Sequence, residues 1–93
     1  FAAFASAKSG LRVMAQSMAR ELGPQGIHVA HVVIDGGIDS PRVRANQPQR
    51  VQDAGPDGLL QPAHIAEQYL NLHRQSRDCW AFEVDLRPWS ERW

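Results

Sequence analysis

Apolar side chains recur at intervals of three and four residues along the first 22 positions of the chain. They fall at Phe4, Ala7, Leu11, Met14, Met18 and Leu22. This spacing places a continuous apolar stripe on one face of an α-helix. The pattern therefore predicts a helix over residues 2–22. We expect Gly23 and Pro24 to end it, because glycine takes the left-handed cap conformation and proline cannot continue a helix.

Three further segments have regular patterns. Residues 27–34, IHVAHVVI, form a nearly unbroken β-branched and apolar run, which is typical of a strand covered on both faces. Residues 62–75 open with proline at the tolerated first helical position and carry an apolar face, which predicts a helix. In residues 80–86 apolar and other side chains alternate, which predicts a strand with one wetter face.

Residues 35–61 lack any such period and are dense in Gly, Pro, Asn and Gln. A connection of this length inside a compact domain is typical of a binding lid or a mobile segment. Within it, Pro41 is expected to begin a short helix that reaches about Ala45. The tail, residues 87–93, has no period, and its tryptophans are expected to anchor on the body of the protein or on a partner.

The order helix, strand, long loop, helix, strand predicts an α/β fold with a parallel sheet. Two strands alone make too small a sheet to close a hydrophobic core. The strand over residues 27–34 in particular needs neighbours that the 93 residues do not supply. We therefore expect the chain to be an incomplete piece of a larger domain.

Composition limits the classes of partner. Ten basic and ten acidic residues give a formal net charge of zero, so neither nucleic acid nor an anionic membrane is expected as a partner. The single cysteine, Cys79, excludes an internal disulfide and fits a reducing cytosol. No metal site is expected, because the chain has no HExxH motif, and His28 and His31 would face opposite sides of a strand.

The first 40 residues carry a resemblance. The segment FAAFASAKSGLRVMAQSMARELGPQGIHVAHVVIDGGIDS resembles the catalytic helix, the following strand and the cofactor loop of the short-chain dehydrogenase/reductase family. In that family the helix bears Tyr-x-x-x-Lys; the tyrosine is the general acid/base, and the lysine binds the nicotinamide ribose and lowers the tyrosine's pKa. Lys8 matches the lysine, but Phe4 stands where the tyrosine should be. Phenylalanine has no ionisable proton, so the usual proton transfer cannot run through this position.

The loop after the first predicted strand resembles the family's Pro-Gly-x-Val-x-Thr. Asp35 replaces the proline, Gly36 is kept, Ile38 stands for the valine and Ser40 for the threonine. The resemblance implies that the backbone of Ile38 binds the nicotinamide carboxamide and that the hydroxyl of Ser40 binds the carboxamide or a phosphate. The expected cofactor-binding residues are thus Lys8, Gly36, Ile38 and Ser40, with Lys8 also catalytic.

The resemblance implies that residues 1–93 are the C-terminal portion of one NAD(P)-binding domain, the last part of a Rossmann-type doubly wound parallel sheet. The implied parent is a cytoplasmic oxidoreductase that uses NAD or NADP to move a hydride to or from a small carbonyl or alcohol substrate. The substrate would lie under residues 35–61, and the first helix would pair with its copy in a homo-oligomer. The 93 residues alone are expected to be inactive.

Several alternatives stay open. Lys8 on its own would be a solvated helix charge, and the apolar stripe would pack only on the chain's own sheet. The protein as a whole would be a noncatalytic relative that binds a dinucleotide or oligomerises, or the chain would be an autonomous structural module without a ligand. If catalysis survives Phe4, the hypothetical proton donor is Asp35, Asp39 or a water held by Lys8, the alternative being that both residues are solvated loop aspartates.

Overall fold

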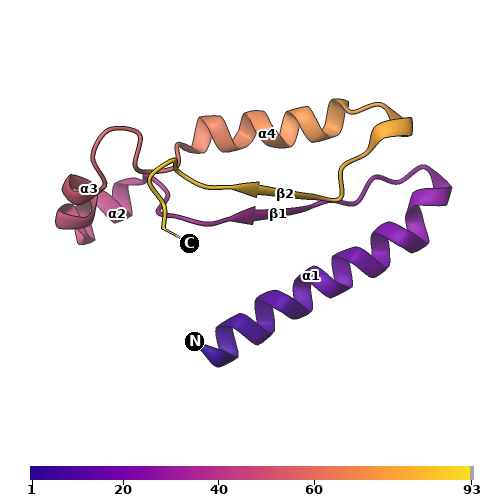
Figure 1. Ribbon diagram of the computed structural model, residues 1–93, viewed down its shortest axis with the longest axis horizontal. Coiled ribbons are helices and arrows are strands. Elements are labelled where there is room, and N and C mark those ends of the chain that lie inside the picture. Colours follow the sequence, from indigo (N-terminus) through magenta and orange to yellow (C-terminus); the bar gives the residue numbers. More distant parts are fainter. Residues whose placement is uncertain (93) are drawn as a thin grey trace. The chain divides into compact units, whose positions relative to one another are not determined.

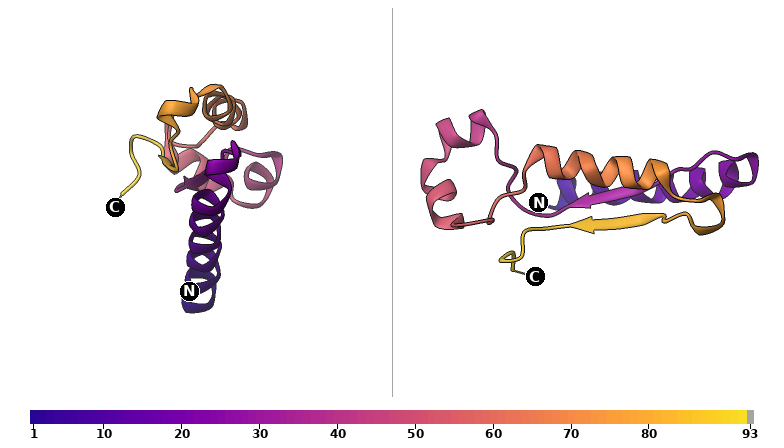
Figure 2. Two further views of the ribbon diagram at one scale, coloured as in Figure 1. Left: turned by 90° about the vertical axis from the view of Figure 1, so that its right-hand side faces the viewer. Right: turned by 90° about the horizontal axis from the view of Figure 1, so that it is seen from above.

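The computed structural model describes residues 1–92, and these residues divide into two compact units. The first unit combines Phe1–Val32 with Leu72–Val84, and the second combines Val33–Asn71 with the segment that begins at Asp85. Figure 1 shows the helices and strands coloured along the sequence, and Figure 2 shows the same elements from two other sides. Each unit is described here by itself.

Helix α1, Ala2–Leu22, has the bounds that the apolar period predicts. The expected glycine cap at its end is wrong. Gly23 keeps right-handed helical angles and begins a short 3-10 turn, η1 (Gly23–Gln25), and the left-handed residue is Gly26 with φ 83°. Pro24 fits the start of this tighter turn because it needs no amide donor there, and the left-handed residue comes at Gly26, three positions later than predicted.

The loop after the first strand contains more helix than its composition indicates. Strand β1 is shorter than the apolar run and covers only His31–Ile34. The short helix expected from Pro41 is present as α2, Pro41–Asn46, and a second one, α3 (Pro48–Ala54), was not predicted. Each begins with a proline at its first position, where the missing amide costs no hydrogen bond.

The rest of the chain forms α4 (Pro62–Arg74), a 3-10 turn η2 (Arg77–Cys79) and strand β2 (Glu83–Leu86). The exposure of β2 alternates along its four residues, as its sequence predicts. Strands β1 and β2 pair in a two-stranded sheet. The pairing is parallel, because the amide of His31 donates to Phe82 and, four residues on in both strands, that of Asp35 donates to Leu86.

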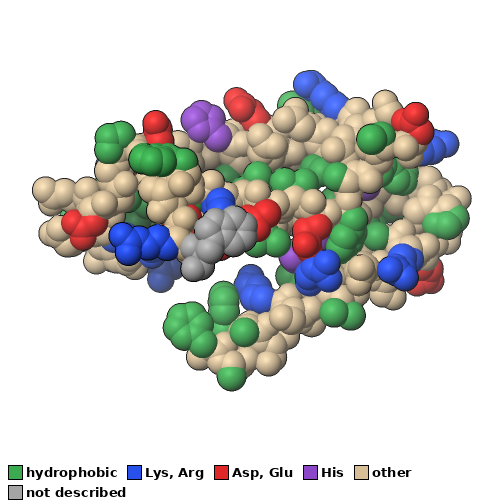
Figure 3. All heavy atoms as spheres, viewed as in Figure 1, with side chains coloured by type: hydrophobic (Ala, Val, Ile, Leu, Met, Phe, Trp, Pro, Cys, Tyr) green, Lys and Arg blue, Asp and Glu red, His purple; other side chains and the backbone are tan. Residues whose placement is uncertain are grey.

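Little of the described chain is buried. The buried residues are Leu72 in the first unit and Gly37 and Pro88 in the second. Helix α1 has no buried residue, and the side chains of its apolar stripe, Phe4, Leu11, Met14 and Met18, are 41–62% exposed. Figure 3 shows hydrophobic side chains gathered at the surface over the start of this helix. Strand β1 is half-buried along its length, so the expectation of a strand covered on both faces is wrong for the described chain.

None of the helices in residues 1–92 is long and apolar enough to cross a membrane.

Candidate functional site

Phe4 and Lys8 lie side by side on α1, as their spacing of four residues requires. The ammonium nitrogen of Lys8 is 5.7 Å from the centroid of the Phe4 ring, and the ring is 62% exposed. Within residues 1–92 no carboxylate lies within ion-pair distance of Lys8. The chain's single lysine therefore presents an uncompensated positive charge beside an aromatic face.

Arg12, one turn after Lys8, ties α1 to the rest of the first unit. Its Nε donates to a carboxylate oxygen of Glu83 at the start of β2, and its guanidinium lies 5.7 Å from the centroid of the Phe82 ring. Nδ1 of His31 lies 3.2 Å from the same carboxylate oxygen. These contacts, the one with Arg12 first, hold the pKa of Glu83 below its usual value. Arg12 and Glu83 are 71 positions apart in the chain, and no local pattern predicts their pairing.

The loop after β1 belongs to the second unit, and its two glycines are sites of close approach. Gly36 has φ 148°, and a Cβ placed on it would lie 2.6 Å from Cδ of Pro88. A Cβ on Gly37 would lie 2.9 Å from a methyl carbon of Leu59 and 3.2 Å from the guanidinium of Arg50. Only glycine fits both positions without a shift of the surrounding atoms.

A parallel bridge fixes the backbone on both sides of Ile38. The amide of Leu60 donates to the carbonyl of Gly37 at 2.8 Å, and the amide of Asp39 donates to the carbonyl of Leu60 at 2.8 Å. In this pattern Leu60 forms both hydrogen bonds with the residues on either side of Ile38. The amide and the carbonyl of Ile38 itself therefore take no part in the bridge. The side chain of Ile38 is 38% exposed.

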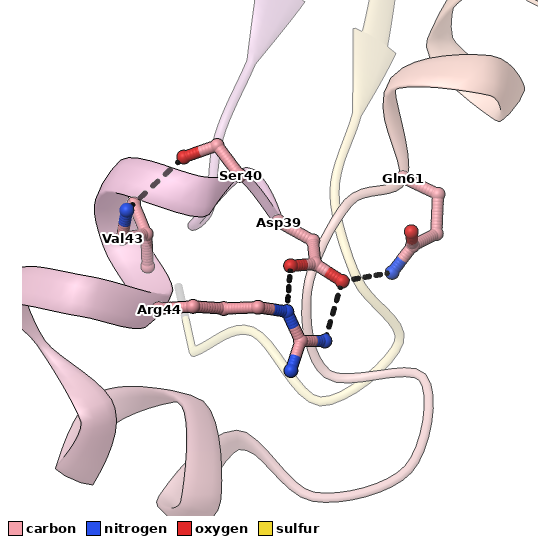
Figure 4. A network of polar contacts seen from close by, with 5 residues as sticks. All are labelled: Asp39, Ser40, Val43, Arg44 and Gln61. Carbon is pink, nitrogen blue, oxygen red and sulfur yellow. Dashed lines mark hydrogen bonds and ion pairs between the residues drawn. The ribbon is translucent and has the colours of Figure 1, made fainter.

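Asp39 is the centre of a polar network that joins the beginning of the loop after β1 to Gln61, the residue before α4 (Figure 4). Arg44 of α2 donates to it through Nε at 2.6 Å and Nη2 at 2.7 Å, and the side-chain amide of Gln61 donates at 3.0 Å. These donors lower the pKa of Asp39 from 3.8 to about 2, with Arg44 as the larger cause and Gln61 as the second. Neither Arg44 nor Gln61 was predicted from the sequence as part of the site.

Ser40 caps helix α2. Its Oγ accepts a hydrogen bond from the amide of Val43 at 3.2 Å, which is the usual bond of an N-cap serine (Figure 4). A hydroxyl both accepts and donates, so the O–H of Ser40 keeps its donor while Oγ serves the cap. The hydrogen bond that caps α2 therefore fixes the position of the Ser40 hydroxyl.

Asp35 is held by the segment after β2. Arg87 places Nη1 2.9 Å from a carboxylate oxygen of Asp35, and its Nε and Nη2 donate to Asp85 at 3.0 and 2.6 Å. The side chain of Arg87 is only 16% exposed. Two strand ends of the second unit are thus joined by one guanidinium that binds carboxylates from both.

These contacts weigh against the hypothesis that a loop aspartate donates the proton that Phe4 cannot. Asp39, with its pKa lowered to about 2, is ionised at neutral pH and has no proton to give. Asp35 is paired with the guanidinium of Arg87. Only 13% of the Asp39 side chain is exposed, whereas the Asp35 side chain is 48% exposed and stays partly solvated although it pairs with Arg87.

The histidines have partners of other kinds. The ring of His28 stacks on that of Trp80 with centroids 4.6 Å apart, and its Nε2 lies 2.7 Å from the carbonyl oxygen of Ala81. His31 contacts Glu83. In the part of the chain that is described, no group of three His, Cys, Asp or Glu residues is placed to hold a metal ion.

The predicted site residues thus fall into two groups. Phe4 and Lys8 lie together in the first unit, whereas Gly36, Ile38 and Ser40 lie together in the second, on one loop. Of the two tail tryptophans, Trp89 is 81% exposed, although its indole N–H donates to the carbonyl of Pro56 at 3.3 Å. Trp93 lies outside the described residues.

Known proteins give the chain a context. No protein-family model matches it. A crystal structure of a short-chain dehydrogenase from Rhodopseudomonas palustris covers 96% of the chain with a TM-score of 0.66 and 44% sequence identity. The chain is similar to part of a short-chain dehydrogenase. It spans 31% of the length of that protein.

A second similarity is to a protein of Escherichia coli strain K12 named the cyclic-di-GMP-binding biofilm dispersal mediator protein. The two are 47% identical over 49 residues, which are 53% of this chain and 20% of that protein. The chain therefore corresponds to a minor part of each of these two relatives.

Proposed function

We propose that the chain is the C-terminal portion of an NAD(P)-dependent oxidoreductase of the short-chain dehydrogenase type. The observation that carries the proposal is the similarity, at 44% identity over nearly the whole chain, to a short-chain dehydrogenase. The mixed fold with a parallel strand pair supports it. A small carbonyl or alcohol substrate and a cytoplasmic location remain predictions from the family resemblance.

The cofactor-binding role is assigned to Lys8, Gly36, Ile38 and Ser40. The residues fit such a role in several respects. Lys8 is a cation without a carboxylate partner among residues 1–92, the amide and carbonyl of Ile38 lie outside the bridge to Leu60, and Ser40 keeps a hydrogen to donate. Gly36 lets the loop turn at a positive φ.

Bound NAD or NADP would supply or accept a hydride at a carbonyl or alcohol carbon of the substrate. In this arrangement Lys8 would orient the ribose by hydrogen bonds and charge, and the loop backbone would orient the carboxamide. Phe4 supplies no proton. We therefore propose that carbonyl reduction by the route of the family's tyrosine is severely weakened in this protein.

The test of the proposal is calorimetric titration of the full-length protein with NADH and NADPH. Binding of either dinucleotide is expected, and the Lys8→Gln variant should bind it about tenfold more weakly, since a charge-assisted hydrogen bond is lost. Arg20→Gln, which removes an exposed cation from the same helix, is the matched control and should bind as the wild type does. No binding by the wild type would refute the proposal.

A noncatalytic dinucleotide-binding protein is the second candidate. Phe4 favours it because the acid/base is missing, and the E. coli relative is named for binding cyclic-di-GMP, itself a dinucleotide. Titration of the same protein with cyclic-di-GMP separates the two functions. Binding of cyclic-di-GMP with no binding of NADH or NADPH would favour the second candidate.

Homo-oligomerisation through α1 is proposed as well. The exposed stripe that includes Leu11, Met14 and Met18 would be covered by a second copy of the helix. Leu11→Glu together with Met18→Glu should lower the mass of the full-length protein measured by light scattering. An unchanged mass would contradict this interface.

A further inference from the structure

Arg50 differs from the other two arginines that surround the loop after β1. Arg44 and Arg87 are each paired with carboxylates, whereas within residues 1–92 no carboxylate lies within ion-pair distance of Arg50. The hydrogen bond of Arg50 is a weak one, from Nη1 to the neutral side chain of Gln47 at 3.3 Å. Arg50 is exposed, and its charge is left uncompensated among the described residues.

The guanidinium of Arg50 lies directly on the backbone of the loop. Gly37 is buried, and a Cβ there would come within 3.3 Å of two guanidinium atoms of Arg50. Any side chain at position 37 would push the arginine away. Because position 37 is glycine, the guanidinium of Arg50 from α3 can lie against the backbone there. The next residue in the chain is Ile38, a proposed cofactor-binding residue.

Arg50 and Gly37 also line an open cavity of about 600 Å³ within the second unit. This volume is in the range of pockets that hold small organic molecules. The lining also includes Asp53 and Glu91, neither of which is paired with Arg50, and a second arginine, Arg92. The charged residues of the wall are therefore two arginines and two acidic residues.

We infer that this cavity binds a small carboxylate, with the carboxylate group on Arg50 at the end near Gly37. Guanidinium binds carboxylates through two parallel hydrogen bonds, and Arg50 has no competing acidic partner among the described residues. The inference rests on the proposed oxidoreductase function in that it names the substrate class, a carbonyl or alcohol compound that carries a carboxylate.

The experiment compares benzoate with benzamide, which has the same shape and no charge. Each is titrated into the full-length protein while NMR follows the amide signal of Gly37 and the Nε–H signal of Arg50. Benzoate is expected to shift both signals and to bind about tenfold more tightly than benzamide. Arg50→Gln should abolish this preference, Arg50→Lys should keep part of it, and Arg42→Gln, which removes an exposed arginine outside the cavity wall, should keep all of it.

Equal binding of benzoate and benzamide by the wild type, or a preference that survives in Arg50→Gln, would overturn the inference. Unchanged positions of the other glycine amide signals in Arg50→Gln show that the variant is folded. NADH titration of the same samples separates this inference from the proposed function. The protein could prefer benzoate through Arg50 and yet bind neither NADH nor NADPH. This result would refute the oxidoreductase proposal and support the carboxylate site.

Discussion

Helix α1 and the loop over residues 35–40 are stabilised in opposite ways. The helix is regular over 21 residues, yet none of them is buried. The loop has almost no repetitive structure, yet it contains a buried glycine, a parallel bridge and a carboxylate with three hydrogen bonds from side chains. Local periodicity therefore produces a helix whose apolar face is left exposed within residues 1–92, whereas the geometry of the loop comes from contacts between residues that are apart in the sequence.

The largest effect is expected where a side chain is added to the loop. Gly36→Ala places a methyl group 2.6 Å from Pro88 and at a positive φ, so the loop or the proline has to move. The free energy of unfolding of the full-length protein, measured in urea, should fall by about 2–3 kcal/mol. Dinucleotide binding should weaken with it.

The matched change in α1 is Gly10→Ala. A Cβ at this position meets no atom within 4 Å, and alanine has the higher helix propensity. The variant should gain about 0.5–1 kcal/mol in the free energy of unfolding. If Gly36→Ala were as stable as Gly10→Ala, the account of the loop as the tightly fitted region would be wrong.

An intermediate effect is expected at Ser40, where a cap and a proposed ligand contact share one hydroxyl. Ser40→Ala removes the acceptor for the amide of Val43 and should cost about 1 kcal/mol. Ser40→Asp keeps an acceptor for the cap but loses the O–H donor. It should unfold like the wild type and bind the dinucleotide more weakly; equal loss of stability in both variants would show that the cap account is incomplete.

A smaller effect concerns the charge of Asp39. Because its pKa in the folded protein is about 2 and its ordinary value is 3.8, the network stabilises the loop fully above about pH 4 and loses this contribution as the pH falls toward 2. In Arg44→Gln the pKa of Asp39 should rise toward 3.8, since the first cause of its lowering is gone. The ¹³C chemical shift of the carboxyl group follows this titration directly.

The Arg44→Gln prediction has a control in Arg42→Gln, which neutralises an exposed arginine of the same helix. Arg42→Gln should leave the midpoint for Asp39 near 2. A midpoint that stays near 2 in Arg44→Gln as well would mean that Arg44 does not hold the carboxylate in solution.

The smallest effect on stability is expected at Phe4, although the effect on chemistry is expected to be large. The ring is 62% exposed, so Phe4→Tyr should change the free energy of unfolding by less than about 0.5 kcal/mol. It would restore an ionisable hydroxyl one turn before Lys8, and carbonyl reduction with NADH or NADPH should rise. Phe1→Tyr adds the same hydroxyl at another exposed position and should not raise turnover.

The sequence predicts well what local patterns determine. The apolar period fixes both ends of α1, the alternation of β2 is observed, and the proline at position 62 marks the first residue of α4. The left-handed conformation was predicted for the wrong residue because two glycines, 23 and 26, compete for this position, and proline at 24 favours a 3-10 turn between them.

The rest of the site depends on contacts that a single sequence does not reveal. Asp39 meets Gln61 across 22 positions, and Arg12 meets Glu83 across 71. Helix α3 was missed because its residues, PQRVQDA, have no apolar period to mark it. The proline at its start was the available signal, since proline at a first helical position also begins α2 and α4.

The central proposal is that the protein binds a nicotinamide dinucleotide and that Lys8 and Ser40 each contribute to this affinity. The measurement that tests it most directly is a double-mutant cycle on the affinity of the full-length protein for NADH or NADPH, with Lys8→Gln, Ser40→Asp and both changes together. The account predicts that the wild type binds one of these dinucleotides and that each single variant weakens the binding by about tenfold. A wild type that binds neither dinucleotide, or variants that bind as tightly as the wild type, would contradict it.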